Sequence, residues 1–365
     1  MRNLLTYFNE MGSVPFKERE FNEVDSLILC QLAYLNFEKV VENVEKKVAL
    51  KDVFVEKNFS LLNEMTFSPK QNIKLMKLIR DSRRFRNIKI SHIENHLSYD
   101  DVKQFYALTF HFPNFKYICF RGTDLTILGW KENFNMSYMK EIPSQKLAYE
   151  YINKIYNNYK CPIYVGGHSK GGNLAIYAAI KSNNDVKDNI IAIYNFDGPG
   201  FNSELLYCDD YLKIRDKIII MTAKEAIIAM LLYHVEDITF IKTKGVSILQ
   251  HIPYNWCVAD NRLKRIKKNT PSSRWFARTI RHFYEDTNEY ERKRFVDLLF
   301  TIVEVSPDNS VEILKKRPFK FLGRVNKKYR GLPKDDKKFM KYILRKYRHS
   351  SYHVVKIKIK SLFSK

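Results

Sequence analysis

Residues 165–175 read VGGHSKGGNLA. The short run before them, residues 161–165, ends in Ile, Tyr and Val and is typical of a buried strand. The residues after them, 173–180, are mostly apolar and rich in alanine, which favours a helix. Of the 12 glycines in the chain, four lie within seven positions around Ser169, where a sharp turn leaves no room for a Cβ. The segment therefore predicts a strand, a tight turn and a helix.

Residues 167–171 match the pattern G-x-S-x-G, in which a serine occupies a strained turn with its hydroxyl exposed. The positive N-terminal end of the following helix would lie beneath that hydroxyl and could stabilise an oxyanion. Ser169 is therefore the candidate nucleophile. The alternative is a glycine-rich turn that binds an anion or only shapes a corner of the fold.

A second segment supports the first, because the strand-like residues 115–120 run directly into Arg121-Gly122-Thr123-Asp124. Acyl transfer needs one N–H donor from the residue after the nucleophile and another from a loop after an earlier strand. Lys170 and Thr123 are the candidates for these oxyanion-hole donors, with the Thr123 hydroxyl as a third. The alternative is an ordinary polar turn after a strand.

Together, residues 120–123 (FRGT) and 166–175 resemble the class 3 lipase group of α/β-hydrolases, in which an F-R-G-[ST] loop forms the oxyanion hole and G-H-S-x-G-G carries the serine. The chain is most similar to a poorly characterised, mainly Gram-positive bacterial branch of that group. The shared features are GWKENF at 129–134, lysine in place of leucine at Lys170, and NFDGPG at 195–200. The resemblance covers about residues 20–260 and implies a lipase-like α/β-hydrolase.

A catalytic serine needs a histidine base, and in α/β-hydrolases the chain order is serine, acid, histidine. His251 is the candidate base, because it follows a predicted strand and resembles the lipase pattern of a histidine with tyrosine three residues later. His234 ends an apolar run and is expected to be a structural residue. The remaining downstream histidines lie in or near the basic C-terminal part: His282, His349 and His353.

The acid has two candidates. Asp197 follows the strongly strand-like residues 190–196, so its carboxylate would lie at the same sheet edge as Ser169. Class 3 lipases instead take the acid from the turn after the next strand, here 217–221, where the usual aspartate is missing and Glu225 is the near neighbour. We rank Asp197 first and Glu225 as the alternative acid. Asp197 could also merely cap the turn through Gly198.

The length and composition of the chain indicate what kind of protein carries this site. The chain has 365 residues, of which 45% are hydrophobic, so it can bury a large core. We expect an α/β-hydrolase domain at 1–260, with a mostly parallel sheet and helices on both faces, and a basic, largely helical region at 261–365. No signal peptide or membrane-spanning run is visible, and the five cysteines show no C-x-x-C, which favours a reduced, cytoplasmic protein.

The formal net charge of +23 is unevenly distributed. Residues 311–365 contain 19 Lys and Arg and three acidic residues, a net charge of +16, with aromatic residues interspersed. Such a region attracts the phosphates of anionic lipid or of nucleic acid. The alternating pattern at residues 352–363 favours a strand. We expect peripheral contact with the inner face of the membrane rather than with nucleic acid; the alternative is a solvated basic surface.

These patterns predict a serine hydrolase that cleaves a lipid ester or another acyl ester, with Ser169, His251 and Asp197 as the triad. No metal or organic cofactor is expected, because the nucleophile and the base are both side chains. Two other functions stay open. One is an inactive binding module with the same fold, and the other is a surface adaptor for membrane or nucleic acid in which the basic region is the functional part.

Overall fold

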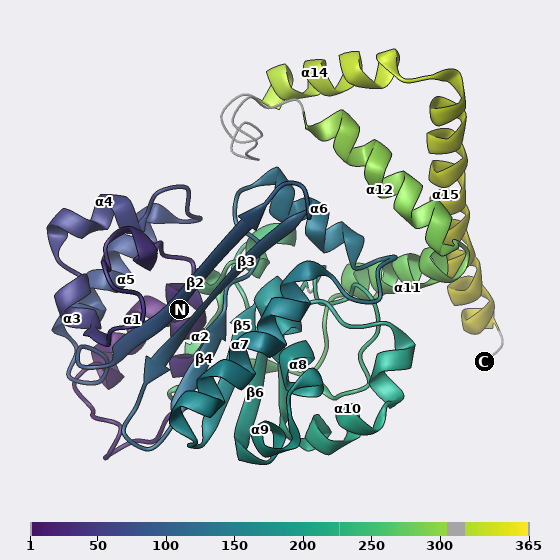
Figure 1. Ribbon diagram of the computed structural model, residues 1–365. Coiled ribbons are helices and arrows are strands. Elements are labelled where there is room, and N and C mark those ends of the chain that lie inside the picture. The colour runs from purple at the N-terminus through teal and green to yellow at the C-terminus, as the bar shows by residue number, and fades with distance from the viewer. Residues whose placement is uncertain (1, 226, 305–317, 364–365) are drawn as a thin grey trace.

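A mixed β-sheet forms the centre of the protein, and the computed structural model describes residues 2–225, 227–304 and 318–363 (Figure 1). Its strands follow the order β1-β2-β3-β4-β5-β6-β7-β8-β11. The strand pairs from β4 to β8 are parallel, whereas those from β1 to β4, and the pair of β8 with β11, are antiparallel. The expectation of a mostly parallel sheet was therefore wrong, because antiparallel strands extend the parallel centre on both sides.

The strands have the following bounds: β1 Val48–Ala49, β2 Lys89–Ser98, β3 Lys103–His111, β4 Lys116–Phe120, β5 Ile163–His168, β6 Ile190–Phe196, β7 Ile218–Ala223, β8 Ile238–Ile241 and β11 Arg265–Ile266. A separate two-stranded sheet pairs β9 Val258–Ala259 with β10 Arg262–Leu263. The strand predicted at 115–120 is confirmed as β4, which forms an antiparallel hairpin with β3.

The helices up to the last strand are α1 Leu4–Met11, α2 Glu23–Leu32, α3 Leu50–Val53, α4 Phe59–Leu62, α5 Pro69–Asp81, α6 Ile127–Asn135, α7 Pro143–Tyr159, α8 Lys170–Lys181, α9 Asn184–Asn189 and α10 Asp209–Ile214. The C-terminal helices are α11 Pro271–Glu285, α12 Glu289–Val303, α14 Pro318–Gly331 and α15 Lys334–Phe363.

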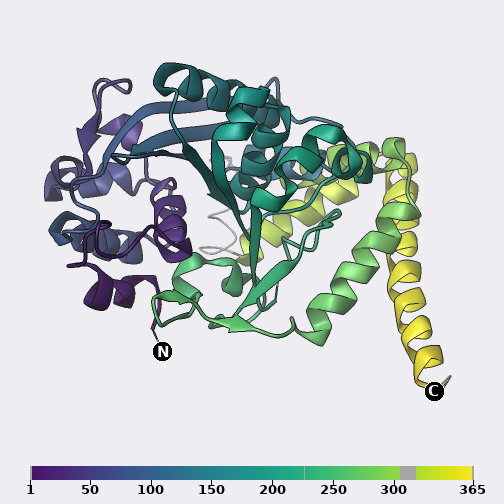
Figure 2. The same ribbon diagram turned by 90° about the horizontal axis from the view of Figure 1, so that it is seen from below.

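Helices cover both faces of the sheet, and strand β4 shows why. Its side chains alternate between two cores: Tyr117 and Cys119 pack with α1, α2 and α5, whereas Ile118 and Phe120 pack with α7 and α8. A strand buried on both faces reads as a continuous apolar run, which is how this strand could be recognised from the sequence. Figure 2 shows the N-terminal helices and the C-terminal helices at opposite ends of the sheet.

The C-terminal region is helical, and α14 and α15 extend away from the sheet (Figure 1). Residues 352–363, for which a strand was expected, belong to helix α15, so that expectation was wrong. Strand β11 lies just beyond residue 260, so the sheet extends past the expected domain boundary. Part of the basic region, residues 305–317 and 364–365, lies outside the described residues. No described helix is long and apolar enough to cross a membrane.

The order of the strands brings three separate segments to one edge of the sheet. Strands β4, β5 and β6 are adjacent and parallel, so their C-terminal ends lie side by side. Arg121 follows β4, Ser169 follows β5 and Asp197 follows β6. The three segments that would form one catalytic site therefore lie side by side, although they are far apart in the chain.

His111 at the end of β3 couples the stability of the sheet to pH. Its Nε2 lies 2.7 Å from Ser91 Oγ on β2. Burial of the ring, together with the charges of Lys47 and Lys116, lowers the pKa of His111 to about 3. The unfolded chain, with a histidine pKa of about 6.5, binds a proton at a pH where the folded protein does not. Acidification from pH 7 therefore favours the unfolded state.

We predict that His111→Gln removes part of this pH dependence. Between pH 7 and pH 5 the free energy of unfolding of the wild type should fall by on the order of 1 kcal/mol more than that of the variant, after allowance for partial exposure of the ring. Urea denaturation of both proteins at the two pH values measures this difference. Parallel losses of stability would contradict the prediction.

Candidate active site

Ser169 occupies a strained backbone conformation between β5 and α8. Its φ is +58° and its ψ is −132°, a combination that a residue with a Cβ adopts only when its surroundings impose it. The Ser169 N–H donates to Phe196 O at 2.9 Å, and its carbonyl accepts from Gly172 N at 2.9 Å. The strand, the turn and the helix that the sequence predicts are all present, although the strand lies at 163–168 instead of 161–165 and the helix begins at Lys170.

Close packing explains why this turn is so rich in glycine. A Cβ on Gly171 would lie 2.1 Å from Phe120 O on β4, and one on Gly172 would lie 2.1 Å from Asn195 Oδ1 on β6. Helix α8 therefore begins directly against both neighbouring strands. This packing leaves the turn no space to relax and keeps Ser169 at the sheet edge.

His251 and Asp197 meet at the same edge. His251 Nδ1 lies 2.6 Å from Asp197 Oδ2. The Asp197 carboxylate is buried, and its other oxygen accepts from Ala223 N at 3.1 Å. A carboxylate that accepts from Nδ1–H fixes the imidazole tautomer that leaves Nε2 with a free lone pair. Such a histidine can accept a proton at Nε2.

His168, the residue before the serine, orients the segment that carries His251. Its Nε2 donates to the carbonyl of His251 at 2.8 Å, and its Nδ1 accepts from the Tyr34 hydroxyl at 2.9 Å. Burial, followed by the nearby charge of His251, lowers the pKa of His168 well below its ordinary value, so this ring stays neutral. His168 therefore links the turn to Tyr34, just after α2, and to the His251 backbone through neutral hydrogen bonds.

The loop after β4 lies against the turn. A Cβ on Gly122 would lie 2.5 Å from the His168 carbonyl and 3.0 Å from Ser169 Cβ. Thr123 follows it and is buried, and its Oγ1 accepts from Asn133 Nδ2 of α6 at 2.5 Å. This places the backbone of the Gly122–Thr123 peptide next to the serine, where an oxyanion donor is needed.

Lys170 carries the second expected donor. As the first residue of α8, its N–H is one of the orphan donors at the helix N-terminus and has no partner within the helix. Its side chain does not reach solvent. It is fully buried and forms an ion pair with Glu132 of α6.

The Lys170–Glu132 ion pair is saturated with hydrogen bonds. Lys170 Nζ lies 2.7 Å from Glu132 Oε2 and also donates to the carbonyl of Gln104 at 2.5 Å and to its side-chain oxygen at 2.9 Å. Glu132 accepts from Gln104 N at 3.1 Å, and from the backbone N–H and the hydroxyl of Ser144 at 3.0 and 2.6 Å. The pair therefore ties the start of α8 to β3, α6 and α7.

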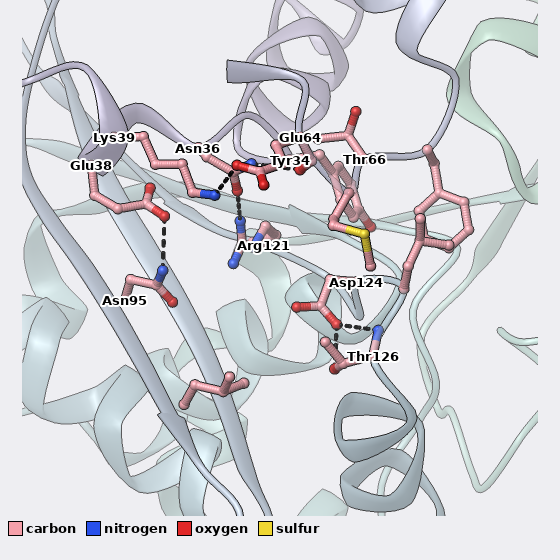
Figure 3. Close-up of a pocket in the computed structure, with 14 residues that line it drawn as sticks. Tyr34, Asn36, Glu38, Lys39, Glu64, Thr66, Asn95, Arg121, Asp124 and Thr126 are labelled. Atoms are coloured by element: carbon pink, nitrogen blue, oxygen red, sulfur yellow. Dashed lines mark hydrogen bonds and ion pairs between the residues drawn. The ribbon is translucent and has the colours of Figure 1, made fainter. Parts of the chain in front are cut away.

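A cavity of about 170 Å³ lies beside the loop after β4 (Figure 3). Tyr34, Arg121 and Asp124 line it, and Tyr34 also bonds to His168 of the turn, whereas Ser169 itself does not line it. The Arg121 guanidinium stacks 3.9 Å from the Tyr106 ring centroid and donates to Asn36 Oδ1 at 3.3 Å.

Glu225, the alternative acid, and His234, which was expected to be structural, have no hydrogen bond to Asp197, His251 or Ser169 among the described contacts. Glu225 accepts from Ser247 N, and its own N–H donates to Gln250 Oε1 at 3.0 Å. His234 Nε2 lies 2.7 Å from the carbonyl of Ala229. The remaining three histidines form a cluster on the C-terminal helices α11 and α15: His282, His349 and His353.

Sequence reasoning missed four residues that support the site: Tyr34, Glu132, Asn133 and His168. Glu132 and Asn133 belong to the segment 129–134 that carried the resemblance, but nothing in the sequence paired them with Lys170 and Thr123. The available signal was a lysine directly before two glycines in a turn that must pack closely, because a buried charge requires an acidic partner.

We predict that Lys170→Met lowers the free energy of unfolding by about 3–5 kcal/mol, because it leaves the buried carboxylate of Glu132 without a counter-charge. The double variant Lys170→Met/Glu132→Gln should lose less than the sum of the two single changes. Lys181→Met, at the exposed end of the same helix, is the matched control and should change stability by less than about 0.5 kcal/mol. Denaturant unfolding of the wild type, the two single variants, the double variant and Lys181→Met measures these values. A Lys170→Met variant as stable as the control would rule out the role of the pair.

Comparison with solved structures finds lipases of low identity. The Rhizomucor miehei lipase propeptide complex shares 14% identity over 65% of this chain and 67% of that chain, with a TM-score of 0.36. M37 lipase shares 17% identity over 57% and 69%, with a TM-score of 0.35. Lipase II from Rhizopus niveus shares 15% identity over 54% and 83%, with a TM-score of 0.32. These scores are too low to carry an inference about activity.

Among curated proteins, no sequence matches this chain. The Mbeg1-like family model matches residues 79–301, a stretch that includes β3 to β8, Ser169, Asp197 and His251. Because this match covers more than half of the 365 residues, the chain belongs to the Mbeg1-like family.

Proposed function

We propose that the protein is a serine hydrolase that cleaves a carboxylic ester of an acyl chain. One observation carries the proposal: the 2.6 Å contact between His251 Nδ1 and Asp197 Oδ2 lies at the sheet edge where Ser169 occupies its strained turn. These residues come from three separate segments and follow the chain order serine, acid, histidine that α/β-hydrolases use. The α/β-hydrolase fold is part of this proposal, supported by the parallel strands β4 to β8 and the serine between β5 and α8.

The proposed reaction has two halves. His251 Nε2 removes the proton of the Ser169 hydroxyl as Oγ attacks the acyl carbon, and Asp197 stabilises the imidazolium that forms. The proton then passes to the leaving alcohol, which leaves an ester between the acyl group and Ser169. Water, deprotonated by His251, attacks this ester and releases the carboxylic acid and free Ser169.

Two backbone donors would stabilise the negative charge that develops on the carbonyl oxygen. The N–H of Lys170 belongs to the unsatisfied first turn of α8, and the N–H of Thr123 lies in the loop packed against Ser169. The buried pair of Lys170 with Glu132, and the bond from Asn133 to Thr123, hold both donors to α6. Such preorganised donors cost no rearrangement during the reaction.

An acyl ester fits the surroundings better than a highly charged substrate. The cavity beside the oxyanion loop has the half-exposed apolar side chains Met65 and Leu97 at its wall. Its charged residues are mostly engaged: Lys39 pairs with Glu64, and Asp124 accepts from Thr126 N at 2.8 Å. A lipid ester or another acyl ester is therefore the proposed substrate class.

The test is labelling by a fluorophosphonate probe, together with hydrolysis of p-nitrophenyl esters of short and long acyl chains. We expect the wild type to be labelled and active, and Ser169→Ala and His251→Ala each to lower kcat by about 10⁴-fold or more. His234→Ala is the matched control, since this histidine bonds to the Ala229 carbonyl instead of to Asp197, and it should retain most activity.

A folded wild type that is inert to both the probe and the esters would reject the hydrolase and favour an inactive binding module with the same fold. Labelling that persists in Ser169→Ala would place the reactive group elsewhere in the chain.

A second experiment separates the two candidate acids. Asp197→Asn should lower kcat by about 10³–10⁴-fold, because asparagine favours the wrong tautomer of His251. Glu225→Gln should change kcat by less than about threefold, because Glu225 bonds to the backbone of Ser247 and not to His251. Steady-state kinetics on one p-nitrophenyl ester measures both. The reverse order of effects would transfer the role of acid to Glu225.

A further inference from the structure

The positive charge of the C-terminal region is concentrated on two helices, α14 and α15, which we call the basic arm. Helix α14 has five basic residues and no acidic one. By contrast, α11 and α12 together have six basic and four acidic residues. Figure 1 shows the basic arm extending beyond α11 and α12, away from the sheet. Most of the net positive charge of the described C-terminal helices therefore lies on the two outermost ones, α14 and α15.

Helix α15 carries its charge as a stripe. Lys338, Lys341, Arg345 and Arg348 are exposed and follow one another at intervals of three or four residues, and Tyr352 continues the row. Residues at this spacing share one face of a helix. The opposite face is apolar and buried, with Met340, Ile343 and Val354. The packing of α15 on α11 therefore leaves the basic stripe directed outward.

The stripe is poorly neutralised by the protein itself. Lys338 lies 3.6 Å from Asp335. Within the described residues, Lys341, Arg345 and Arg348 have no carboxylate within 4 Å. Lys346, which lies off the stripe, instead pairs with Glu291 of α12 at 3.1 Å. Lys346 therefore has a partner inside the protein, whereas three of the four cations of the stripe have no carboxylate partner among the described residues.

Helix α14 adds apolar side chains to the basic surface. Phe319 is 86% exposed and Leu322 58% exposed, whereas Phe321 on the opposite side is buried. By helical spacing, Lys327 and Arg330 share the exposed face with them. Water is a poor environment for a phenyl ring and an isobutyl group, and a helix with such a face is typical of binding at a lipid interface.

We propose that the basic arm docks the protein on an anionic lipid bilayer. The stripe of α15 would lie against the lipid phosphates, and Phe319 and Leu322 of α14 would enter the boundary between head groups and acyl chains. Each half complements the other, because charge alone gives a weak, salt-sensitive attachment and two apolar side chains alone give little. A nucleic acid would accept the charge but offers no apolar phase for Leu322.

The attachment of the basic arm links this surface to the active-site edge. Helix α12 contacts α14 and α15 and packs on α6 through a small core of Ile127, Val296 and Phe300. Arg292 of α12 donates to Ser137 O at 2.6 Å, just after α6. Helix α6 directly follows the loop after β4 that contains Thr123. The docked surface and the Ser169 edge are thus joined through one helix, a relation that matters for catalysis only under the proposed function.

The test is co-sedimentation of the full chain with vesicles, which requires no catalytic activity. The wild type should bind vesicles of phosphatidylcholine containing about a third phosphatidylglycerol at least about tenfold more tightly than vesicles of phosphatidylcholine alone. Binding should weaken in about 0.5 M salt, where the charges are screened within a few ångströms. The variant Lys341→Gln/Arg345→Gln/Arg348→Gln should lose at least about tenfold in affinity, and Phe319→Ser/Leu322→Ser should also bind more weakly.

A matched control removes the same charge elsewhere. Lys57→Gln/Lys70→Gln/Lys74→Gln changes three exposed lysines, one just before α4 and two on α5, at the opposite end of the molecule, and should bind like the wild type. Circular dichroism and fluorophosphonate labelling of each variant show whether it is folded, since the basic arm contains none of the proposed catalytic residues. Equal binding to both vesicle types, or equal losses in both triple variants, would overturn the proposal. Binding to duplex DNA or RNA without binding to vesicles would replace the bilayer with a nucleic acid.

Discussion

The close packing of the Ser169 turn is the constraint on which the rest of the site depends. Helix α8 begins so near β4 and β6 that a single added methyl group at Gly171 or Gly172 would lie 2.1 Å from an oxygen of a neighbouring strand. This packing imposes the positive φ of Ser169, whose cost is of order 1–3 kcal/mol. It also fixes the distance from Ser169 to the Gly122–Thr123 loop after β4 and to Asp197 after β6. The turn, the loop and the acid are therefore positioned by one set of contacts.

Polar contacts around the turn hold in place the neighbouring segments that close packing alone does not position. On one side, His168 bonds to Tyr34 and to the His251 backbone, so a neutral imidazole positions the segment that carries the second histidine. On the other side, the Lys170–Glu132 pair fastens α8 to α6. Asn133, the residue after Glu132 in α6, donates to Thr123. Buried charges are costly unless fully paired, and this pair meets that condition with several further hydrogen bonds. Both expected oxyanion donors are thus attached to the same helix.

The sequence allowed the local structure around Ser169 to be predicted, because an apolar run, two pairs of glycines and an alanine-rich run have few structural solutions. It also located strands β4 and β6 to within one residue. It did not reveal strand β2, where charged residues and histidines interrupt the apolar alternation. The pairing of Lys170 with Glu132 was equally hidden, since 38 residues separate them and only the sheet topology brings them together.

The wrong prediction at residues 352–363 has a different origin. Alternating valine, isoleucine and lysine favour a strand, but these residues continue α15, and a helix satisfies its own backbone hydrogen bonds, whereas a single strand needs a neighbouring strand. The mixed character of the sheet was missed for a related reason. Local patterns mark strands without showing their direction, and antiparallel strands β1, β2 and β11 were joined to the parallel centre.

Under the proposed function, Ser169 attacks an acyl carbon whose oxygen accepts from the N–H groups of Thr123 and Lys170. A crystal structure of the protein after reaction with a fluorophosphonate is the decisive measurement, because the phosphonyl oxygen imitates the oxyanion. We expect phosphorus bonded to Ser169 Oγ, with that oxygen about 2.7–3.1 Å from the N–H groups of both donors. An adduct on another residue, or an oxygen that points away from both N–H groups, would contradict the proposal.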